Sequence, residues 1–113
     1  MNILQILPKL DVGGVETGTI DLAKELINRG HKVIVVSGGG KLVKNLRDIS
    51  VKHIELPVHK KSPFTVIKCI KNLEEIIRIE RIDVVHSRSR VPNIIAFFAA
   101  RRAGAKFITT AHG

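Results

Sequence analysis

The chain has 113 residues, and its 19 lysine and arginine residues outweigh its 10 aspartate and glutamate residues to give a formal net charge of +9. That length accommodates one small domain and excludes two, and 44% hydrophobic with 26% charged residues is typical of a folded globular chain rather than a disordered one. The single cysteine, Cys69, excludes an internal disulfide framework and a cysteine-rich zinc site, which favours a reducing compartment.

The sequence predicts neither a signal peptide nor a membrane span. The first residues lack a basic start followed by a long apolar run. The longest uninterrupted apolar run, 94–100, is far shorter than the roughly 20 residues that cross a bilayer. We therefore expect a soluble, single-domain protein of the cytoplasm.

The positive charge is concentrated in the second half of the chain. Residues 1–56 carry 8 basic and 6 acidic side chains, whereas residues 57–113 carry 11 and 4. This asymmetry favours an anionic partner such as nucleic acid, anionic lipid or a phosphorylated small molecule, with a solvated basic surface as the alternative. We expect no nucleic-acid partner, because the chain has no tryptophan or tyrosine and only four phenylalanines with which to stack bases.

The first half of the chain predicts a strand–helix–strand unit. Residues 2–7 form a short apolar run that ends at Pro8, as expected of a buried strand. Apolar residues then return at helical spacing over 15–29, with Gly30 as the stop, and residues 33–36 form a second continuous apolar run. Continuous apolar strands joined through a helix are typical of a parallel sheet that is covered on both faces.

The second half repeats this pattern. In chain order we expect a short helix around 42–49, a strand at 51–56, a helix at 63–79 that begins at Ser62–Pro63, a strand at 83–86, a helix at 92–103 that ends at Gly104, and a strand at 106–110. Five strands and about four helices predict an α/β fold with a doubly wound (Rossmann-like), mostly parallel sheet. Since no helix follows the last strand, we expect one face of that edge to be bare, as in a chain cut from a longer one or completed by a partner.

Adjacent glycines follow the first predicted strand. Gly13 and Gly14 let backbone N–H groups approach an anion closely, and the N-terminus of the following helix adds partial positive charge. The spacing of Gly13, Gly14 and Gly18 is GGxxxG, which is neither a dinucleotide fingerprint nor a Walker loop. The loop therefore predicts an anion site outside the NAD and P-loop classes, with a simple turn as the alternative.

Two more predicted loops lie at the same edge of the sheet. His86, Arg88 and Arg90 come straight after a strand, where two guanidiniums can hold a phosphate or carboxylate; the alternative is a solvated loop in which Ser89 caps the next helix. His112 follows the last strand, where a neutral imidazole can hydrogen-bond a hydroxyl or act as acid or base. No zinc set, Ser-His-Asp triad or carboxylate pair can be assembled at this edge, so we expect no metal site.

Taken together, these segments resemble a known family. The sequence is similar to the N-terminal half-domain of family-4 retaining glycosyltransferases of the GT-B type, especially bacterial members of lipopolysaccharide and surface-polysaccharide synthesis. The resemblance implies a single, truncated N-terminal Rossmann-like domain over residues 1–113. It is carried by the segments ILQILPKLDVGGVE, LAKELINRGHKVIVVS and IDVVHSRSRVPNIIAFFAARRAGAKFITTAHG.

The resemblance also implies roles for particular residues. The glycine loop faces the donor diphosphate, the histidine near the C-terminus is catalytic and lies near the transferred sugar, and the segment after the fourth strand binds the acceptor. These residues are, in that order, Gly13 and Gly14; His112; and His86, Arg88 and Arg90. Basic residues that meet the membrane or a lipid-linked acceptor are Lys60, Lys61, Arg101 and Arg102. The nucleotide sugar is a substrate, and neither a cofactor nor a metal is expected.

The expected function is the acceptor-side portion of a glycosyltransferase that moves a sugar from a nucleotide-sugar donor to a lipid-linked or polysaccharide acceptor in lipopolysaccharide and cell-envelope glycan synthesis. The family's C-terminal, nucleotide-sugar-binding domain is missing from this sequence, so we expect the chain to be inactive unless that half is supplied in trans. Peripheral contact with the cytoplasmic face of the inner membrane is part of this expectation. The alternative is a non-catalytic basic α/β module that docks on an anionic membrane surface or a protein partner, and a third reading is the unfolded relic of a decayed gene.

Overall fold

The computed structural model describes residues 1–11 and 14–110, with side chains from residue 17 onward in the second range. Five strands form one sheet in the order β3-β2-β1-β4-β5, and every neighbouring pair is parallel. The strands are β1 (Asn2–Ile6), β2 (Lys32–Ser37), β3 (Lys52–Glu55), β4 (Val84–Arg88) and β5 (Lys106–Thr110). The expectation of a doubly wound, Rossmann-like α/β sheet is confirmed.

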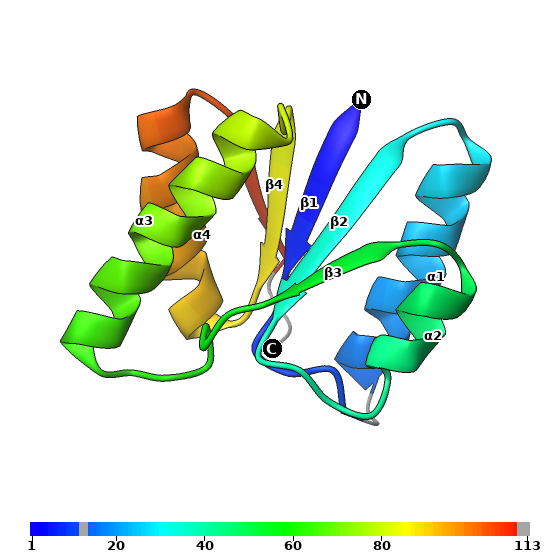
Figure 1. Cartoon of the computed structure of the whole chain (residues 1–113), viewed down its shortest axis with the longest axis horizontal. Coiled ribbons are helices and arrows are strands. Elements are labelled where there is room, and N and C mark those ends of the chain that lie inside the picture. Colours follow the sequence, from blue (N-terminus) through cyan, green and yellow to red (C-terminus); the bar gives the residue numbers. More distant parts are fainter. Residues whose placement is uncertain (12–13, 111–113) are drawn as a thin grey trace.

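Helices cover both faces of the sheet. One layer consists of α1 (Gly14–Asn28) and α2 (Val43–Asp48), and the other consists of α3 (Pro63–Ile79) and α4 (Arg90–Ala103). Figure 1 shows the two layers on opposite sides of the strands. In the part of the chain that the structure describes, no helix is both long and apolar enough to cross a bilayer.

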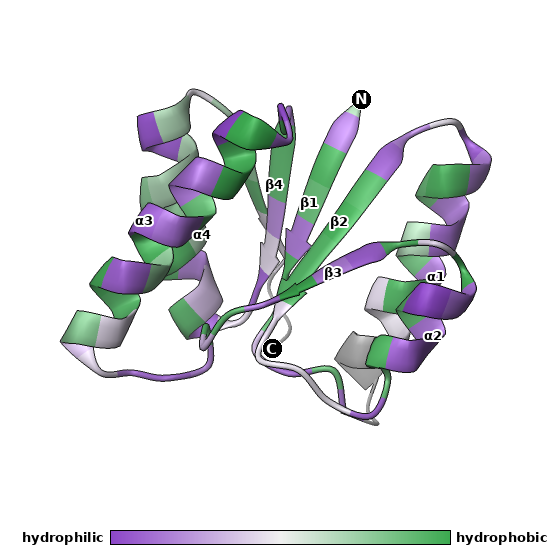
Figure 2. Cartoon of the chain, viewed as in Figure 1, coloured by the Kyte–Doolittle hydropathy of each residue, from purple (hydrophilic) through white to green (hydrophobic). Residues whose placement is uncertain are grey.

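Two apolar cores follow from the alternation of side chains along the central strands. Leu4 and Ile34 belong to the core beneath α3 and α4, whereas Val33 and Val35 belong to the core beneath α1 and α2. Because β1 and β2 are buried on both faces, their sequences are continuous apolar runs rather than alternating ones. Figure 2 shows this concentration of hydrophobic residues in β1 and β2.

Two of the predicted helix boundaries are confirmed. Pro63 is the first residue of α3, and Ser62 occupies the N-cap position, although its side chain makes no capping hydrogen bond. Gly104 ends α4 in the left-handed conformation, with a φ of 79°, which glycine adopts without the steric cost that a Cβ brings.

The boundary between β4 and α4 differs from the sequence prediction. The strand continues to Arg88 and the helix already begins at Arg90, so the expected loop shrinks to Ser89 alone. The strand is extended because it has a parallel neighbour on each side, with Ser87 paired with Ile6 and Arg88 paired with Thr110. His86 and Arg88 are therefore strand residues, not loop residues.

The predicted bare face is also observed. Among the described residues, no helix covers β5 on the side that faces the α1 layer, and Ile108 there is 52% exposed. A shallow hollow of about 220 Å³ lies on this face, between β4, β5 and α1. Its lining includes Leu22, Leu26, Val84 and His86.

Candidate functional site

The strand order locates the candidate site. Successive connections run from β1 outward to β2 and β3, and then return to place β4 on the other side of β1. In open α/β sheets of this kind, ligands bind outside the carboxyl ends of the strands at the point where the order reverses. That switch point lies between β1 and β4.

Arg88 is the charged residue at this point. Its guanidinium lies against α1, where a Cβ placed on Gly18 would be 3.6 Å from the Arg88 Nη1 atom. Its Nε is buried without a hydrogen-bond partner, and no carboxylate among the described residues forms an ion pair with it. Burial lowers the pKa of this guanidinium, yet arginine stays charged in proteins. A half-buried guanidinium that forms no ion pair with a described carboxylate is well placed to bind an anion.

Gln5 is a second buried polar residue beside Arg88, and sequence reasoning missed it. It is 2% exposed, and neither its side-chain oxygen nor its nitrogen has a hydrogen-bond partner among the described residues. It pairs in register with His86, so Gln5, His86 and Arg88 project from the same face of the sheet. A buried amide without partners costs about 1–3 kcal/mol. The only signal in the sequence was a single polar residue inside an apolar run.

His86 is held by the last strand. Its Nε2 lies 2.5 Å from the Thr110 hydroxyl, which fixes the orientation of the half-buried imidazole. Thr110 pairs with Arg88 across β4 and β5. Together, Gln5, His86, Arg88 and Thr110 form what we call the switch-point cluster.

Ser89 separates the two predicted arginines. Its φ of 80° and ψ of 159° belong to a region that is essentially confined to glycine, and strain of this kind concentrates at functional sites. Ser89 occupies the N-cap position of α4, but its side chain makes no capping hydrogen bond. Arg88 is half-buried against α1, whereas Arg90 is exposed at the start of α4. That both guanidiniums bind one ligand stays a prediction.

Three of the predicted site residues lie at or beyond the limits of the described chain. Gly13 and His112 are outside the described residues. Gly14 is the first residue of α1, so the N-terminus of this helix lies where the sequence predicted it. The roles predicted for Gly13, Gly14 and His112 stay predictions.

The four basic residues predicted to meet a membrane or an acceptor fall into two groups. Lys60 and Lys61 are exposed in the β3–α3 connection, and Arg101 and Arg102 are exposed in the last turn of α4. Arg102 also has a structural contact, because its Nε donates to Glu74 on α3 at 2.7 Å. A hydrogen bond from Arg102 is the main cause that lowers the pKa of the Glu74 carboxyl, and a hydrogen bond from Arg78 adds to it.

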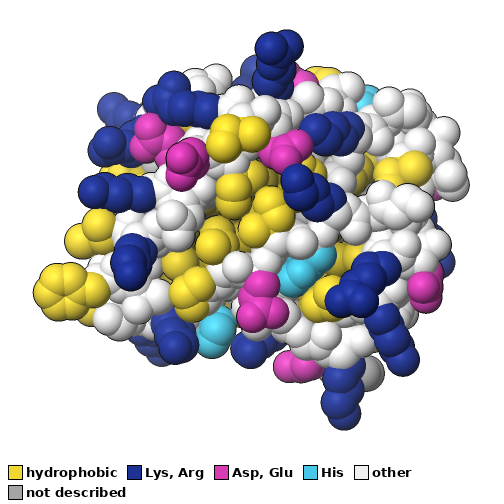
Figure 3. All heavy atoms as spheres, in the orientation of Figure 1, with side chains coloured by type: hydrophobic (Ala, Val, Ile, Leu, Met, Phe, Trp, Pro, Cys, Tyr) yellow, Lys and Arg dark blue, Asp and Glu magenta, His cyan; other side chains and the backbone are white. Residues whose placement is uncertain are grey.

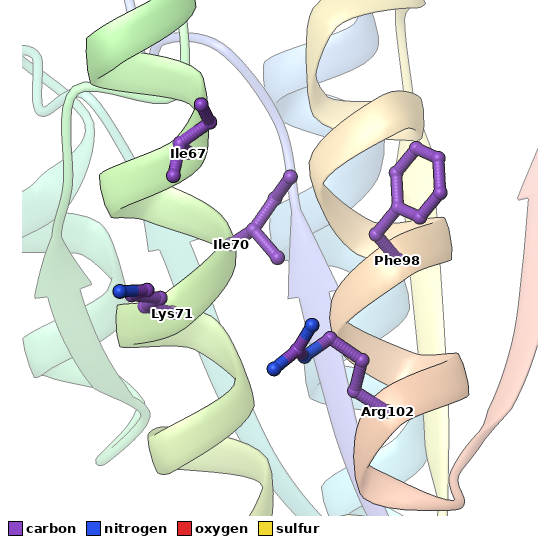
Figure 4. A pocket seen from close by; sticks show the side chains of 5 residues that line it. All are labelled: Ile67, Ile70, Lys71, Phe98 and Arg102. Carbon is purple, nitrogen blue, oxygen red and sulfur yellow. The ribbon is translucent and has the colours of Figure 1, made fainter.

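A groove runs between α3 and α4, and Figure 4 shows the side chains that line it. It has a volume of about 270 Å³ and is formed by Ile67, Ile70, Lys71, Phe98 and Arg102. We refer to it as the α3–α4 groove. No group of three histidine, cysteine, aspartate or glutamate side chains in residues 1–11 and 17–110 is arranged to hold a metal ion.

Comparison with known proteins agrees with this architecture. The crystal structure of a glycosyltransferase from Rickettsia africae ESF-5 is 45% identical, with a TM-score of 0.90, over 99% of this chain and 30% of that chain. MurG from Acinetobacter baumannii is 17% identical, with a TM-score of 0.76, over 96% of this chain and 34% of that chain, and shows the fold alone. The fold is therefore that found in GT-B-type glycosyltransferases.

A curated human protein is also similar. It is one of the subunits of phosphatidylinositol N-acetylglucosaminyltransferase, and it is 31% identical over 110 residues, which are 90% of this chain and 23% of the human protein. This chain thus spans less than a third of the glycosyltransferase structure and about a quarter of the human protein. A family model described as Glycosyltransferase Family 4 matches residues 12–113. The chain therefore belongs to glycosyltransferase family 4.

Proposed function

We propose that this chain is the acceptor-side portion of a glycosyltransferase that moves a sugar from a nucleotide-sugar donor to a lipid-linked or polysaccharide acceptor. One observation carries the proposal: the half-buried Arg88 guanidinium has no carboxylate among the described residues and lies against α1 at the switch point. The remaining substrate contacts are proposed to lie outside the segment that this chain spans. The proposal includes no metal and no other cofactor.

The resemblance placed Arg88 on the acceptor side, but we assign it to the leaving diphosphate, because its guanidinium lies against α1. In this proposal, Arg88 and the N-terminus of α1 supply the electrostatic part of the mechanism. When the glycosidic bond to the donor breaks, negative charge grows on the leaving diphosphate. A fixed guanidinium and the positive end of a helix stabilise that charge, and they need no reorganisation as the reaction proceeds. The backbone N–H groups of Gly13 and Gly14 are proposed to contact the diphosphate in the same way.

The residues of β4 and β5 supply the acceptor side. His86 is fixed by Thr110 and borders the uncovered face of the sheet, where it can orient an acceptor hydroxyl. His112 is proposed to lie near the transferred sugar, and Arg90 to contact an anionic part of the acceptor. Family resemblance supports transfer with retention of configuration.

The chemical class of the proposed acceptor is inferred from related proteins. The human relative is named as part of a phosphatidylinositol N-acetylglucosaminyltransferase, which supports a lipid-linked acceptor for this chain. Bacterial members that the sequence resembles act in lipopolysaccharide and surface-polysaccharide synthesis, which supports a cell-envelope glycan as the product. Peripheral contact with the cytoplasmic face of the inner membrane follows from such an acceptor.

A hybrid enzyme tests the proposal. Residues 1–113 replace the matching segment of the Rickettsia africae glycosyltransferase, and transfer of labelled sugar from a panel of nucleotide sugars into a bacterial lipid extract is measured. We expect the hybrid to transfer one of these sugars, and we expect neither part alone to do so. A hybrid that unfolds cooperatively yet neither binds nor turns over any nucleotide sugar contradicts the proposal.

A docking role is the second candidate function, and a specific observation favours it. Hydrophobic side chains beside the α3–α4 groove are unusually exposed: Phe64 by 85%, Ile67 by 56% and Phe98 by 47%. Figure 3 shows hydrophobic side chains along α3 with lysine and arginine side chains around them. Apolar side chains framed by cations are typical of a surface that inserts into the headgroup region of an anionic membrane.

Vesicle binding tests this second role. We expect the chain to sediment with phosphatidylglycerol vesicles and not with phosphatidylcholine vesicles, and we expect added salt to release it. Replacing Phe64 and Ile67 by serine removes the apolar contacts and is expected to weaken binding. Ile108→Ser, in β5 on the opposite face of the sheet, is the matched control. Equal binding by both variants contradicts a docking role for this surface.

A further inference from the structure

A second polar hollow lies at the carboxyl ends of β2 and β3, at the same edge of the sheet as the switch-point cluster. It has a volume of about 320 Å³. Its lining consists of Lys9, Gly38, Glu55, Leu56, Pro57, His59 and Lys60. We call it the β2–β3 hollow. Apart from Lys60, the sequence analysis gave none of these residues a role in a binding site.

The glycines that follow β2 create this hollow. A Cβ on Gly38 would overlap the His59 imidazole and would lie 2.8 Å from the Pro8 carbonyl oxygen. A Cβ on Gly39 would lie 2.6 Å from the Glu55 carboxylate. Both distances are too short for a side chain, so the absence of a Cβ lets the imidazole and the carboxylate lie directly against the backbone.

The polar groups of the hollow leave donors available. The Lys9 Nζ donates to the Gly38 carbonyl at 3.2 Å, which uses one of its three N–H groups. Lys60 is exposed at the rim. His59 lines the hollow, and its Nδ1 is buried against Gly38 with no hydrogen-bond partner among the described residues. The pKa of His59 is lowered mainly by burial and, to a smaller extent, by the charges of Lys9 and Lys60. The Glu55 carboxylate acts in the opposite direction.

These charges favour an anionic group. Two lysines, Lys9 and Lys60, line the hollow with a single carboxylate, Glu55, so the hollow has an excess of positive charge. A phosphate oxygen accepts charge-assisted hydrogen bonds from ammonium groups and from a protonated imidazole. The Glu55 carboxylate can accept a hydrogen bond from a hydroxyl next to that phosphate.

We propose that the β2–β3 hollow binds a phosphate group of the acceptor, with Lys9, His59 and Lys60 as its ligands. That the bound phosphate belongs to the acceptor rests on the proposed function. That the hollow binds a phosphate group at all does not depend on it. The phosphate belongs either to a lipid headgroup or to a free phosphorylated sugar, and the two sources share this chemistry.

Nuclear magnetic resonance of the histidine rings tests the proposal directly. The 113-residue chain, labelled in histidine, is titrated with inorganic phosphate, glycerol 3-phosphate or monomeric dihexanoylphosphatidylglycerol, against sodium chloride at equal ionic strength. We expect phosphate to move the His59 ring signals saturably and to raise the pKa of His59, because a bound anion favours the protonated imidazole. We expect the His31 ring to respond no differently to phosphate than to chloride.

Matched lysine variants sharpen this test. Lys9→Met and Lys60→Met each remove one ammonium from the hollow and are expected to weaken phosphate binding about tenfold. Lys44→Met, on the exposed surface of α2, is the control and should bind as the unaltered chain does. The inference is overturned if His59 responds to phosphate only as it does to chloride, or if the Lys9 and Lys60 variants bind as tightly as the Lys44 variant.

The outcomes separate this inference from the proposed function. Binding of both small phosphates and the short-chain lipid supports the inference with a lipid headgroup as the source, and binding of the small phosphates alone supports it with a phosphorylated sugar. Phosphate binding together with an inactive hybrid overturns the proposed function and leaves the phosphate site standing. An active hybrid without phosphate binding overturns this inference alone.

Discussion

The Ser37 hydroxyl at the end of β2 and the polar side chains of the switch-point cluster differ in whether they are hydrogen-bonded. At the end of β2, the Ser37 hydroxyl lies 2.6 Å from the His53 Nε2 and accepts a hydrogen bond from the Gly39 N–H at 3.1 Å. In the switch-point cluster, Gln5 and Arg88 have buried polar atoms without a hydrogen-bond partner among the described residues. Burial of a polar group is costly unless it is hydrogen-bonded, so the first arrangement stabilises the fold and the second destabilises it. Polar atoms held at such a cost are expected to be available for a ligand.

Removing the Ser37 hydroxyl should have the largest effect on stability. Ser37→Ala leaves the Gly39 N–H and the His53 ring without their shared partner. We expect the free energy of unfolding to fall by about 1–3 kcal/mol, the cost of an unsatisfied buried group. Urea denaturation checks the value, with exposed Ser62→Ala as the control because Ser62 makes no capping hydrogen bond. Equal stability of the two variants would mean that the Ser37 hydrogen bonds do not stabilise the fold, and the contrast with the switch-point cluster would be lost.

Replacing Gln5 is expected to raise the free energy of unfolding, where replacing Ser37 lowers it. Gln5→Leu replaces a buried amide that has no hydrogen-bond partner among the described residues with an apolar side chain of similar size, so it should raise the free energy of unfolding by about 1 kcal/mol. The measurement is again urea denaturation, and Gln5→Glu is the companion variant. Burial of a carboxylate at this position should lower the free energy of unfolding, and its attraction to Arg88 should offset part of that loss. A loss of stability in Gln5→Leu would mean that the amide has a structural role.

A smaller gain is expected at Ser89. Its backbone conformation is costly for any residue with a Cβ, so Ser89→Gly should raise the midpoint of thermal unfolding, by an amount equivalent to about 1 kcal/mol or less. Ser89→Ala keeps the strain and should leave the midpoint unchanged, since the serine side chain makes no capping hydrogen bond. If glycine and alanine behave alike, the junction between β4 and α4 is not strained.

The smallest effect is the pH dependence that comes from His53. Burial, as the main cause, lowers the pKa of His53 below its ordinary value of 6.5, so the unfolded chain takes up a proton more readily than the folded one. Stability from this group is present above pH 6.5 and is lost as the pH falls from there through the lower pKa of the folded state. Urea denaturation at about pH 7.5 and about pH 5 should show that His53→Gln reduces this loss. The same acid sensitivity in both proteins would exclude His53 as its source.

Much of the fold follows from local sequence. The apolar runs of β1 and β2, the proline at the start of α3 and the glycine at the end of α4 are visible in the sequence and lie where they were predicted. The end of β4 was placed too early, because polar residues such as Ser87 and Arg88 extend the strand only by virtue of the neighbours on both sides. Strand pairing of that kind cannot be read from composition.

The candidate site was predicted less completely than the fold. Arg88 and His86 were found because they lie at the carboxyl end of a strand that the sequence predicts, although both belong to β4 itself. Gln5 was missed because the absence of a hydrogen-bond partner is a property of the packed structure. The β2–β3 hollow was missed because Lys9 and His59 are far apart in sequence and meet only after the sheet has formed.

The rate of sugar transfer by the hybrid enzyme with Arg88→Met tests the central claim most directly. Arg88 is proposed to stabilise the leaving diphosphate, and removal of one such group typically costs about 10²–10³ in rate, so we expect a loss of about a hundredfold or more. Arg47→Met, an exposed arginine of α2, is the matched control and should leave the rate unchanged. Equal rates for the two variants, both folded, would contradict the account of the switch-point cluster as a substrate site.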